Sequence, residues 1–182
     1  MINSLIELYI AFDEVYDDIL PVCISCIDHD CEGYIWILPD EESALSDVGA
    51  EIIEVNGDCG ICNFINPLKS YTPSDFEQMK PKCPLRVNGL CSVYNVRPLV
   101  CRIYPVGFLR IDGEVSIILS KDCAYSRALS GKKKKQFVDN ILGVFDRCSQ
   151  TLYDNIVGTY SIVDGYFKYP DGPNEYEVIG KL

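Results

Sequence analysis

Residues 83–105 constrain the fold of this chain more than any other stretch. They place three cysteines, three arginines and three prolines within 23 residues. A loop-rich segment of this kind needs an organising centre, and the thiolates of Cys83, Cys91 and Cys101 are suited to bind a metal. The other half of such a site would be Cys23, Cys26 and Cys31, about fifty residues upstream. We therefore predict that the fold brings two distant segments together around a metal site.

Soft thiolate ligands favour zinc or an iron–sulfur cluster over magnesium or calcium. The irregular spacing of the cysteines, without two matched pairs, favours an iron–sulfur cluster, of the 4Fe–4S type, with zinc as the alternative. Cys123 follows a predicted hairpin and is a further candidate ligand. These thiols exceed the four that one cubane or one zinc ion needs, so either two sites exist or some cysteines are structural.

Four further residues of the central stretch are predicted neighbours of the cofactor. Arg97 and Arg102 would offset the negative charge of thiolates and sulfides, and Tyr94 and Tyr104 would shield the cluster from solvent. A competing interpretation pairs the arginines with the first third of the chain. Residues 1–60 contain fifteen Asp and Glu and no Lys or Arg, whereas the remaining residues contain twelve acids and sixteen bases.

The remaining metal-ligand side chains are less informative. Cys59 and Cys62 have redox-type spacing but lack the βαβ context of a thioredoxin motif, which leaves a second metal site or a simple loop. His29 lies between Cys26 and Cys31, where it is either a ligand or a bystander. Cys148 is predicted to be a small buried hydrophobe within a long helix.

The length and the hydrophobic patterns predict a single domain over residues 1–182 of the α+β class. Its metal-binding core would span about 20–125, as a small, irregular, cysteine-rich unit with short strands and a hairpin. This core would pack on an N-terminal helix and a long C-terminal helix, the latter with the tail over 131–182. The predicted elements are a helix over 4–20 stopped by Pro21, strands over 34–38 and 51–55, and short helices over 40–47 and from Thr72. They continue with a compact turn or short helix over 96–104 that has Pro98 near its start, a hairpin over 106–119 turning at Asp112-Gly113, a helix over 131–159 and a hairpin in the tail.

Location and partners follow from what the sequence lacks. We find no secretory signal and no apolar run of about 20 residues, which predicts a cytoplasmic protein without a membrane partner. In that compartment thiols stay reduced or bind metal. The single basic run, Lys132 to Lys135, is expected to be a solvated helix face, so no nucleic-acid partner is predicted. A protein partner is left open.

The cysteine pattern resembles that of a known family. Cys23-x2-Cys26-x4-Cys31, the segment Leu38-Pro39-Asp40-Glu41, Cys83-Pro84, and Cys91-x2-Tyr94-x2-Arg97-Pro98-x2-Cys101-Arg102-x-Tyr104-Pro105 are similar to the YkgJ-like cysteine-cluster family of zinc- or iron-chelating proteins. A related module occurs in flagellin lysine methylases. The resemblance covers roughly residues 20–125 and implies binding of a metal or cluster. One departure is that the family's first motif usually ends in two adjacent cysteines, whereas Glu32 follows Cys31 here.

Three functions remain open at this point. The leading one is a cytosolic protein that holds an iron–sulfur cluster or zinc through thiolates. A second is a metal-dependent enzyme, with protein lysine N-methylation suggested by the methylase resemblance, although no strand is followed by a Gly-rich, cofactor-cradling turn. A third is a disulfide-stapled structural protein, which the missing secretory signal disfavours.

Overall fold

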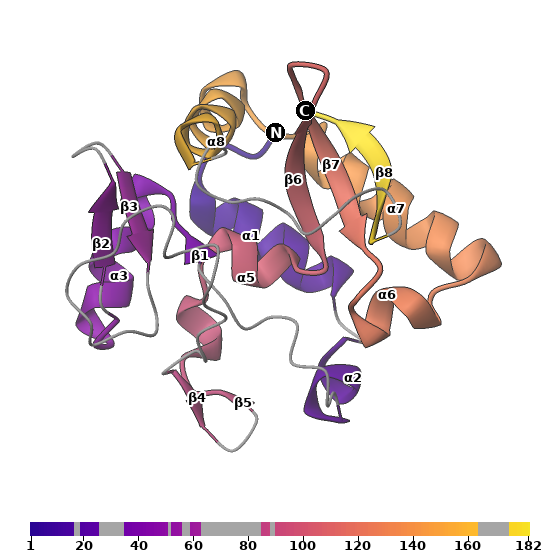
Figure 1. The fold of residues 1–182 in the computed structure, drawn as a ribbon, viewed down its shortest axis with the longest axis horizontal. Helices are drawn as coiled ribbons and strands as arrows, with labels where there is room; N and C mark the ends of the chain where they lie inside the picture. The colour runs from indigo at the N-terminus through magenta and orange to yellow at the C-terminus, as the bar shows by residue number, and fades with distance from the viewer. Residues whose placement is uncertain are drawn as a thin grey trace.

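A computed structural model describes residues 1–16, 19–25, 35–50, 52–55, 59–62, 85–87, 90–163 and 175–182 (Figure 1). This part of the chain combines helices with three small antiparallel sheets, so the α+β prediction is confirmed. None of its helices is both long and apolar enough to cross a bilayer. The short helix predicted from Thr72 lies outside these residues.

The N-terminal segment forms two helices where the sequence predicted one. Helix α1 covers Leu5–Val15 and begins at Ser4, whose Oγ accepts a hydrogen bond from the Glu7 amide at 3.3 Å. Helix α2 covers Leu20–Ser25. The prediction that Pro21 stops a helix was therefore wrong. Pro21 lies in the first turn of α2, where an amide has no helical partner and proline fits.

A small three-stranded sheet comes next in the chain. Strands β1 (Ile35–Trp36), β2 (Ile52–Val55) and β3 (Cys59–Cys62) pair antiparallel in the order β1-β3-β2. A 3₁₀ turn, η1 (Pro39–Glu41), and helix α3 (Glu42–Asp47) lie between β1 and β2. The predicted strands and short helix are confirmed in shorter form. The Cys-x-x-Cys segment, however, is strand rather than loop.

The central cysteine stretch contains more regular structure than expected. Strands β4 (Arg86–Val87) and β5 (Leu90–Cys91) form a two-stranded sheet. A 3₁₀ turn, η2 (Tyr94–Val96), and helix α5 (Leu99–Ile103) follow it. Pro98 is the N-cap of α5, which confirms the prediction of a compact turn or short helix over 96–104.

The largest sheet has the order β6-β7-β8. Strands β6 (Val106–Ile111) and β7 (Glu114–Ser120) form the predicted hairpin. Its turn residues Asp112 and Gly113 have φ angles of 52° and 86°, as a type I′ turn requires. The tail does not end in a hairpin of its own within the described residues, since β8 (Tyr176–Lys181) pairs with β7 as a third strand.

The C-terminal half contains α6 (Ala124–Ala128), α7 (Gly131–Phe145) and α8 (Gln150–Val163). The prediction of one helix over 131–159 was wrong. At the break, the Ile2 amide donates to the Arg147 carbonyl and the Ser149 amide donates to the Ile2 carbonyl, both at 2.7 Å. The N-terminal segment thus supplies partners for backbone groups that the helix would otherwise satisfy internally. Cys148 lies in this corner rather than within a helix.

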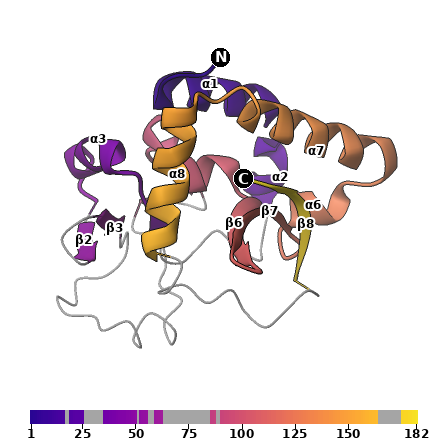
Figure 2. The same ribbon diagram turned by 90° about the horizontal axis from the view of Figure 1, so that it is seen from above.

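The hydrophobic core lies between the large sheet and helices α1, α7 and α8. Helix α1 packs against α7, and both views show the pair beside the sheet (Figures 1 and 2). Aromatic contacts fill the centre, where the Phe108 ring lies 5.8 Å from Phe145 and 6.0 Å from Trp36. A second, smaller cluster forms around Ile37 and Leu45.

Candidate metal centre

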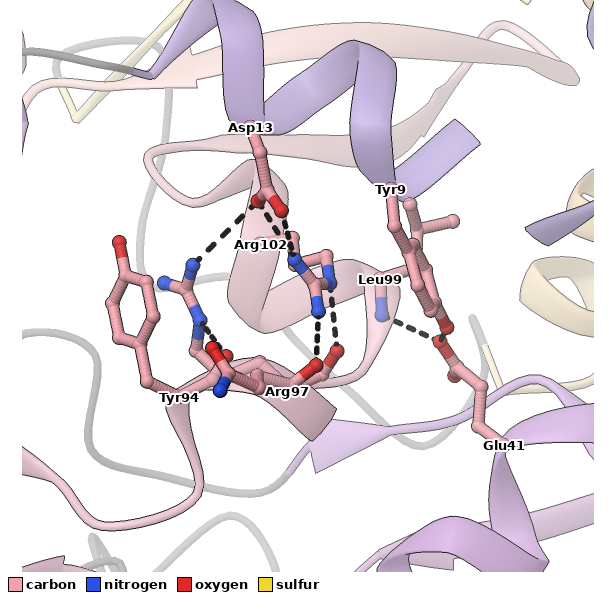
Figure 3. A network of polar contacts seen from close by, with 8 residues as sticks. Tyr9, Asp13, Glu41, Tyr94, Arg97, Leu99 and Arg102 are labelled. Carbon is pink, nitrogen blue, oxygen red and sulfur yellow. Dashed lines mark hydrogen bonds and ion pairs between the residues drawn. The ribbon is translucent and has the colours of Figure 1, made fainter. Parts of the chain in front are cut away.

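One face of α1 carries the polar contacts that organise the central cysteine stretch (Figure 3). Tyr9, Asp13 and Tyr16 are spaced i, i+4 and i+7, which places them on the same side of the helix over about two turns. All three contact α5 or the residues bonded to it. We call these three residues, together with Glu41 and Arg102, the α1–α5 seam.

The centre of the seam is an ion pair between Asp13 and Arg102. Nη1 of Arg102 lies 2.7 Å from both carboxylate oxygens of Asp13. The other guanidinium nitrogens donate to the backbone, Nε to the Arg97 carbonyl at 3.1 Å and Nη2 to the Asn95 carbonyl at 2.6 Å. Arg102 is 6% exposed, so this fork ties a buried charge to α1 and to the loop preceding α5.

The N-terminal end of the seam is the carboxylate of Glu41, which is 5% exposed. It accepts hydrogen bonds from the Leu38 amide at 2.7 Å, from the Leu99 amide at 2.6 Å, and from the Tyr9 hydroxyl. The Leu99 amide opens α5 and has no partner within that helix. Burial raises the pKa of Glu41, and the three hydrogen bonds oppose that shift. Burial, followed by the Glu41 charge, also raises the pKa of Tyr9.

The C-terminal end of the seam is Tyr16, the C-cap of α1. Its hydroxyl donates to the carbonyl of Ile103, the last residue of α5. Burial raises the pKa of Tyr16 well above its ordinary value, and nearby Tyr125 and Cys123 raise it further. The hydroxyl of Tyr16 is thus bonded to the end of α5, while its ring packs on Phe137, whose ring also contacts Tyr125 of α6.

The arginines and tyrosines of the central stretch occupy defined positions. The Arg97 guanidinium lies 3.5 Å from the centroid of the Tyr94 ring, its Nε donates to the Tyr94 carbonyl at 3.0 Å, and its Nη2 lies 3.9 Å from Asp13. Both arginines thus face Asp13, which confirms that they bridge to the acidic N-terminal third. Tyr104 caps α5 and packs half-buried against the main core. A role for any of these residues beside a cofactor stays a prediction.

Two of the predicted ligands lie on helices that touch each other. Cys23 is an exposed residue of α2, and the buried Cys123 is the N-cap of α6. Helix α2 packs against α6, and Figure 1 shows the two helices together. Residues one hundred positions apart in the sequence are therefore carried by neighbouring elements.

Two other predicted ligands belong to the central stretch. Cys91 ends β5, Cys101 lies within α5, and both side chains are half-buried. Cys101 packs against the small cluster around Ile37 and Leu45, whereas Cys123 belongs to the main core. In Figure 1 the β4–β5 hairpin lies to the left of α2 and α6. The structure thus places Cys101 and Cys123 in different hydrophobic clusters.

Among the residues that the structure describes, no three His, Cys, Asp or Glu side chains gather in a group that would hold a metal ion. The predicted ligands Cys26, Cys31 and Cys83 lie outside the described residues, as does His29. Cys59 and Cys62 are paired in register with Val55 and Ile52 of β2. Their extended backbone differs from the turn by which a Cys-x-x-Cys pair chelates one ion.

Cys148 has the character predicted for a structural cysteine. It is half-buried, and its Sγ lies 3.6 Å from the Val144 carbonyl. Burial raises its pKa to about 11, so the thiol stays protonated at neutral pH. A protonated thiol is a poor nucleophile and a poor metal ligand.

Sequence reasoning missed the carboxylates of the seam. The hydrophobic pattern over residues 4–20 predicted a helix without indicating which of its acids would bind a buried partner. The signal in the sequence was that Asp13 lies about one turn from both Tyr9 and Tyr16, at the edge of the face that the helix buries, where its side chain remains 52% exposed. The buried charge is that of Arg102, which requires an anion, and Asp13 at this edge supplies it.

No protein-family model matches this chain, and no curated protein or solved structure shows a significant match to it.

Proposed function

We propose that this protein binds a metal centre, an iron–sulfur cluster or alternatively zinc, through cysteine thiolates from two distant segments. The observation that carries the proposal is the α1–α5 seam, because α5 holds Cys101 and α1 is followed by α2, which holds Cys23. The buried side chains of Arg102 and Glu41 fix α5 against α1, which gives the chain the rigid support that a preorganised binding site requires.

The donor set fits such a group in its chemistry. Thiolates are soft ligands, and the described thiols of Cys23, Cys91, Cys101 and Cys123 are carried by short elements or their ends rather than by the long helices. An iron–sulfur cluster would supply one-electron transfer, whereas zinc would supply a structural crosslink. The proposed ligands are Cys23, Cys26, Cys31, Cys83, Cys91, Cys101 and Cys123.

The pattern of the sequence adds support. The cysteine spacing resembles that of YkgJ-like proteins, and the residues Glu41, Arg97 and Arg102 of that pattern interlock here around α5. A cytoplasmic location would keep the thiols reduced and free to act as ligands. We therefore also propose that the chain belongs to the YkgJ-like family and that it resides in the cytoplasm.

Anaerobic purification followed by metal analysis and absorption spectroscopy tests the proposed function. Iron with acid-labile sulfide and a broad visible absorption would support a cluster, and stoichiometric zinc in a colourless protein would support the alternative. A protein that contains neither metal, and takes up neither after reduction of its thiols, would overturn the proposal.

A further inference from the structure

The α1–α5 seam has a role beyond holding a short helix in place. We propose that Asp13, Glu41 and Tyr16 are positioning residues of the metal site, which set the position of the Cys101 segment relative to the Cys23 segment before any metal binds. This inference rests on the proposed function, because it concerns the same site. It assigns a role to three residues that are not themselves ligands.

The order of the contacts shows why the seam fixes a register. Along α1, Tyr9 meets Glu41, which in turn binds the first amide of α5 at Leu99. One turn later Asp13 binds Arg102, and at the cap Tyr16 binds the carbonyl of Ile103. The contacts therefore run in the same direction along both helices. Bonds at both ends of α5 prevent it from sliding or rotating against α1.

Asp13 also acts on the segment between two proposed ligands. Arg102, oriented by Asp13, donates to the carbonyls of Asn95 and Arg97, which lie between Cys91 and Cys101. Removal of the Asp13 charge leaves a buried guanidinium without its anion, since Arg102 is 6% exposed. The loop would then lose its restraint, and the two thiols would lose their fixed relative position.

The seam reaches the other pair of thiols through Tyr16. Its carbonyl accepts a hydrogen bond from the Ile19 amide at 3.1 Å, and the Ile19 carbonyl accepts one from the Cys23 amide at 3.0 Å. The side chains of Tyr16 and Cys123 both belong to the main hydrophobic core. The hydroxyl of Tyr16 is bonded to the end of α5. Tyr16 is therefore bonded to the end of α5 through its hydroxyl and linked to Cys23 of α2 through the backbone of Ile19.

The test compares Asp13→Asn with Asp13→Glu and with Glu14→Gln, an exposed acid that follows Asp13 on the same helix. Zinc affinity is measured on metal-free protein by competition with a chromophoric chelator. We expect Asp13→Asn to lower the affinity about tenfold or more, because a charge-assisted hydrogen bond is lost. Asp13→Glu should recover part of the loss, and Glu14→Gln should match the wild type.

A second readout needs no metal. In metal-free protein, alkylation of Cys101 should become faster in Asp13→Asn, while alkylation of Cys148, in the corner between α7 and α8, should stay slow. If both cysteines become reactive, Asp13→Asn has unfolded. The positioning role is then tested with Tyr16→Phe, which removes a single hydroxyl. Tyr16→Phe should speed the labelling of Cys101 alone.

The outcomes separate the two proposals. Wild-type affinity and wild-type labelling in both Asp13→Asn and Tyr16→Phe would overturn the positioning role and leave metal binding intact. A wild-type protein that binds neither iron nor zinc would overturn the proposed function and the positioning role together, and it would be recognised before any variant is made.

Discussion

Arg102 binds both carboxylate oxygens of Asp13 through Nη1, across 89 positions of sequence. The same guanidinium donates to the carbonyls of Asn95 and Arg97, so one side chain joins the first helix, the 3₁₀ turn η2 and α5. The sequence motif around Cys101 is therefore in part a docking element. Its arginine is directed at an acid of the N-terminal third.

Replacement of a proposed ligand should separate metal binding from folding. Cys101→Ser should lower the metal content of anaerobically purified protein, because serine is a poor ligand for zinc and for iron–sulfur clusters. Cys148→Ser should leave the metal content unchanged, since that thiol has a pKa of about 11 and bonds within the corner between α7 and α8. Equal metal content in both variants would contradict the assignment of Cys101 as a ligand.

Arg102→Lys should destabilise the fold although the charge is retained. A lysine has no planar fork, so the Asn95 and Arg97 carbonyls would lose their donors, at a cost of about 2 kcal/mol in the free energy of unfolding. Denaturant titration of the metal-free protein measures this loss of unfolding free energy. Arg110→Lys is the control, because Arg110 is exposed and bonds to Gly113 and Ser161 at the surface. If Arg110→Lys lowered the free energy of unfolding as much as Arg102→Lys, the special role of the buried Arg102 guanidinium would be contradicted.

Glu41→Gln should cost stability in a pH-dependent way. In this variant, the backbone amide of either Leu38 or Leu99 would face the new NH₂ group instead of an acceptor. This lost hydrogen bond should lower the free energy of unfolding by about 1–2 kcal/mol. The folded-state pKa of Glu41 is raised, so its contribution to stability is complete below pH 4.5 and is lost as pH rises through the folded pKa. The deficit of the glutamine variant should therefore be largest in acid and shrink toward neutral pH.

Unfolding curves at several pH values between about 4 and 8 would measure that deficit, with Glu42→Gln, an exposed neighbour, as the control. A deficit that grows as pH rises would show that the carboxylate is stabilised in its ionised form, contrary to the direction given above.

Gly180→Ala should loosen the attachment of β8. A Cβ at Gly180 would lie 2.5 Å from Cδ2 of Leu142 on α7, so that side chain must move, at a cost of about 1 kcal/mol. Gly158→Ala in α8 is the matched control, because nothing lies within 4 Å of the position that a Cβ would take there and alanine favours a helix. Thermal melts should therefore shift in opposite directions. A stabilising Gly180→Ala would contradict the close packing of β8 on α7.

Local patterns predicted the elements whose causes are local. The Asp112-Gly113 turn needs only residues that tolerate positive φ between two apolar runs, and the start of α5 needs only Pro98. The candidate ligands were likewise visible as a cysteine spacing. The partners of Arg97 and Arg102 were predicted only as a charge class, because fifteen acids in the first 60 residues offered no means to single out Asp13.

The amino-acid sequence by itself determined that this chain forms amphipathic helices and a tight hairpin, because helical periodicity and turn chemistry act over short distances. The tertiary structure alone decided where α7 ends, since Ile2 caps the corner at Cys148 from the far end of the chain. It alone also selected Asp13 and Glu41 as the partners of α5. Any acceptor that packing brings within hydrogen-bond distance can satisfy a buried cation or amide. Only the folded chain therefore determines which acceptor forms the bond.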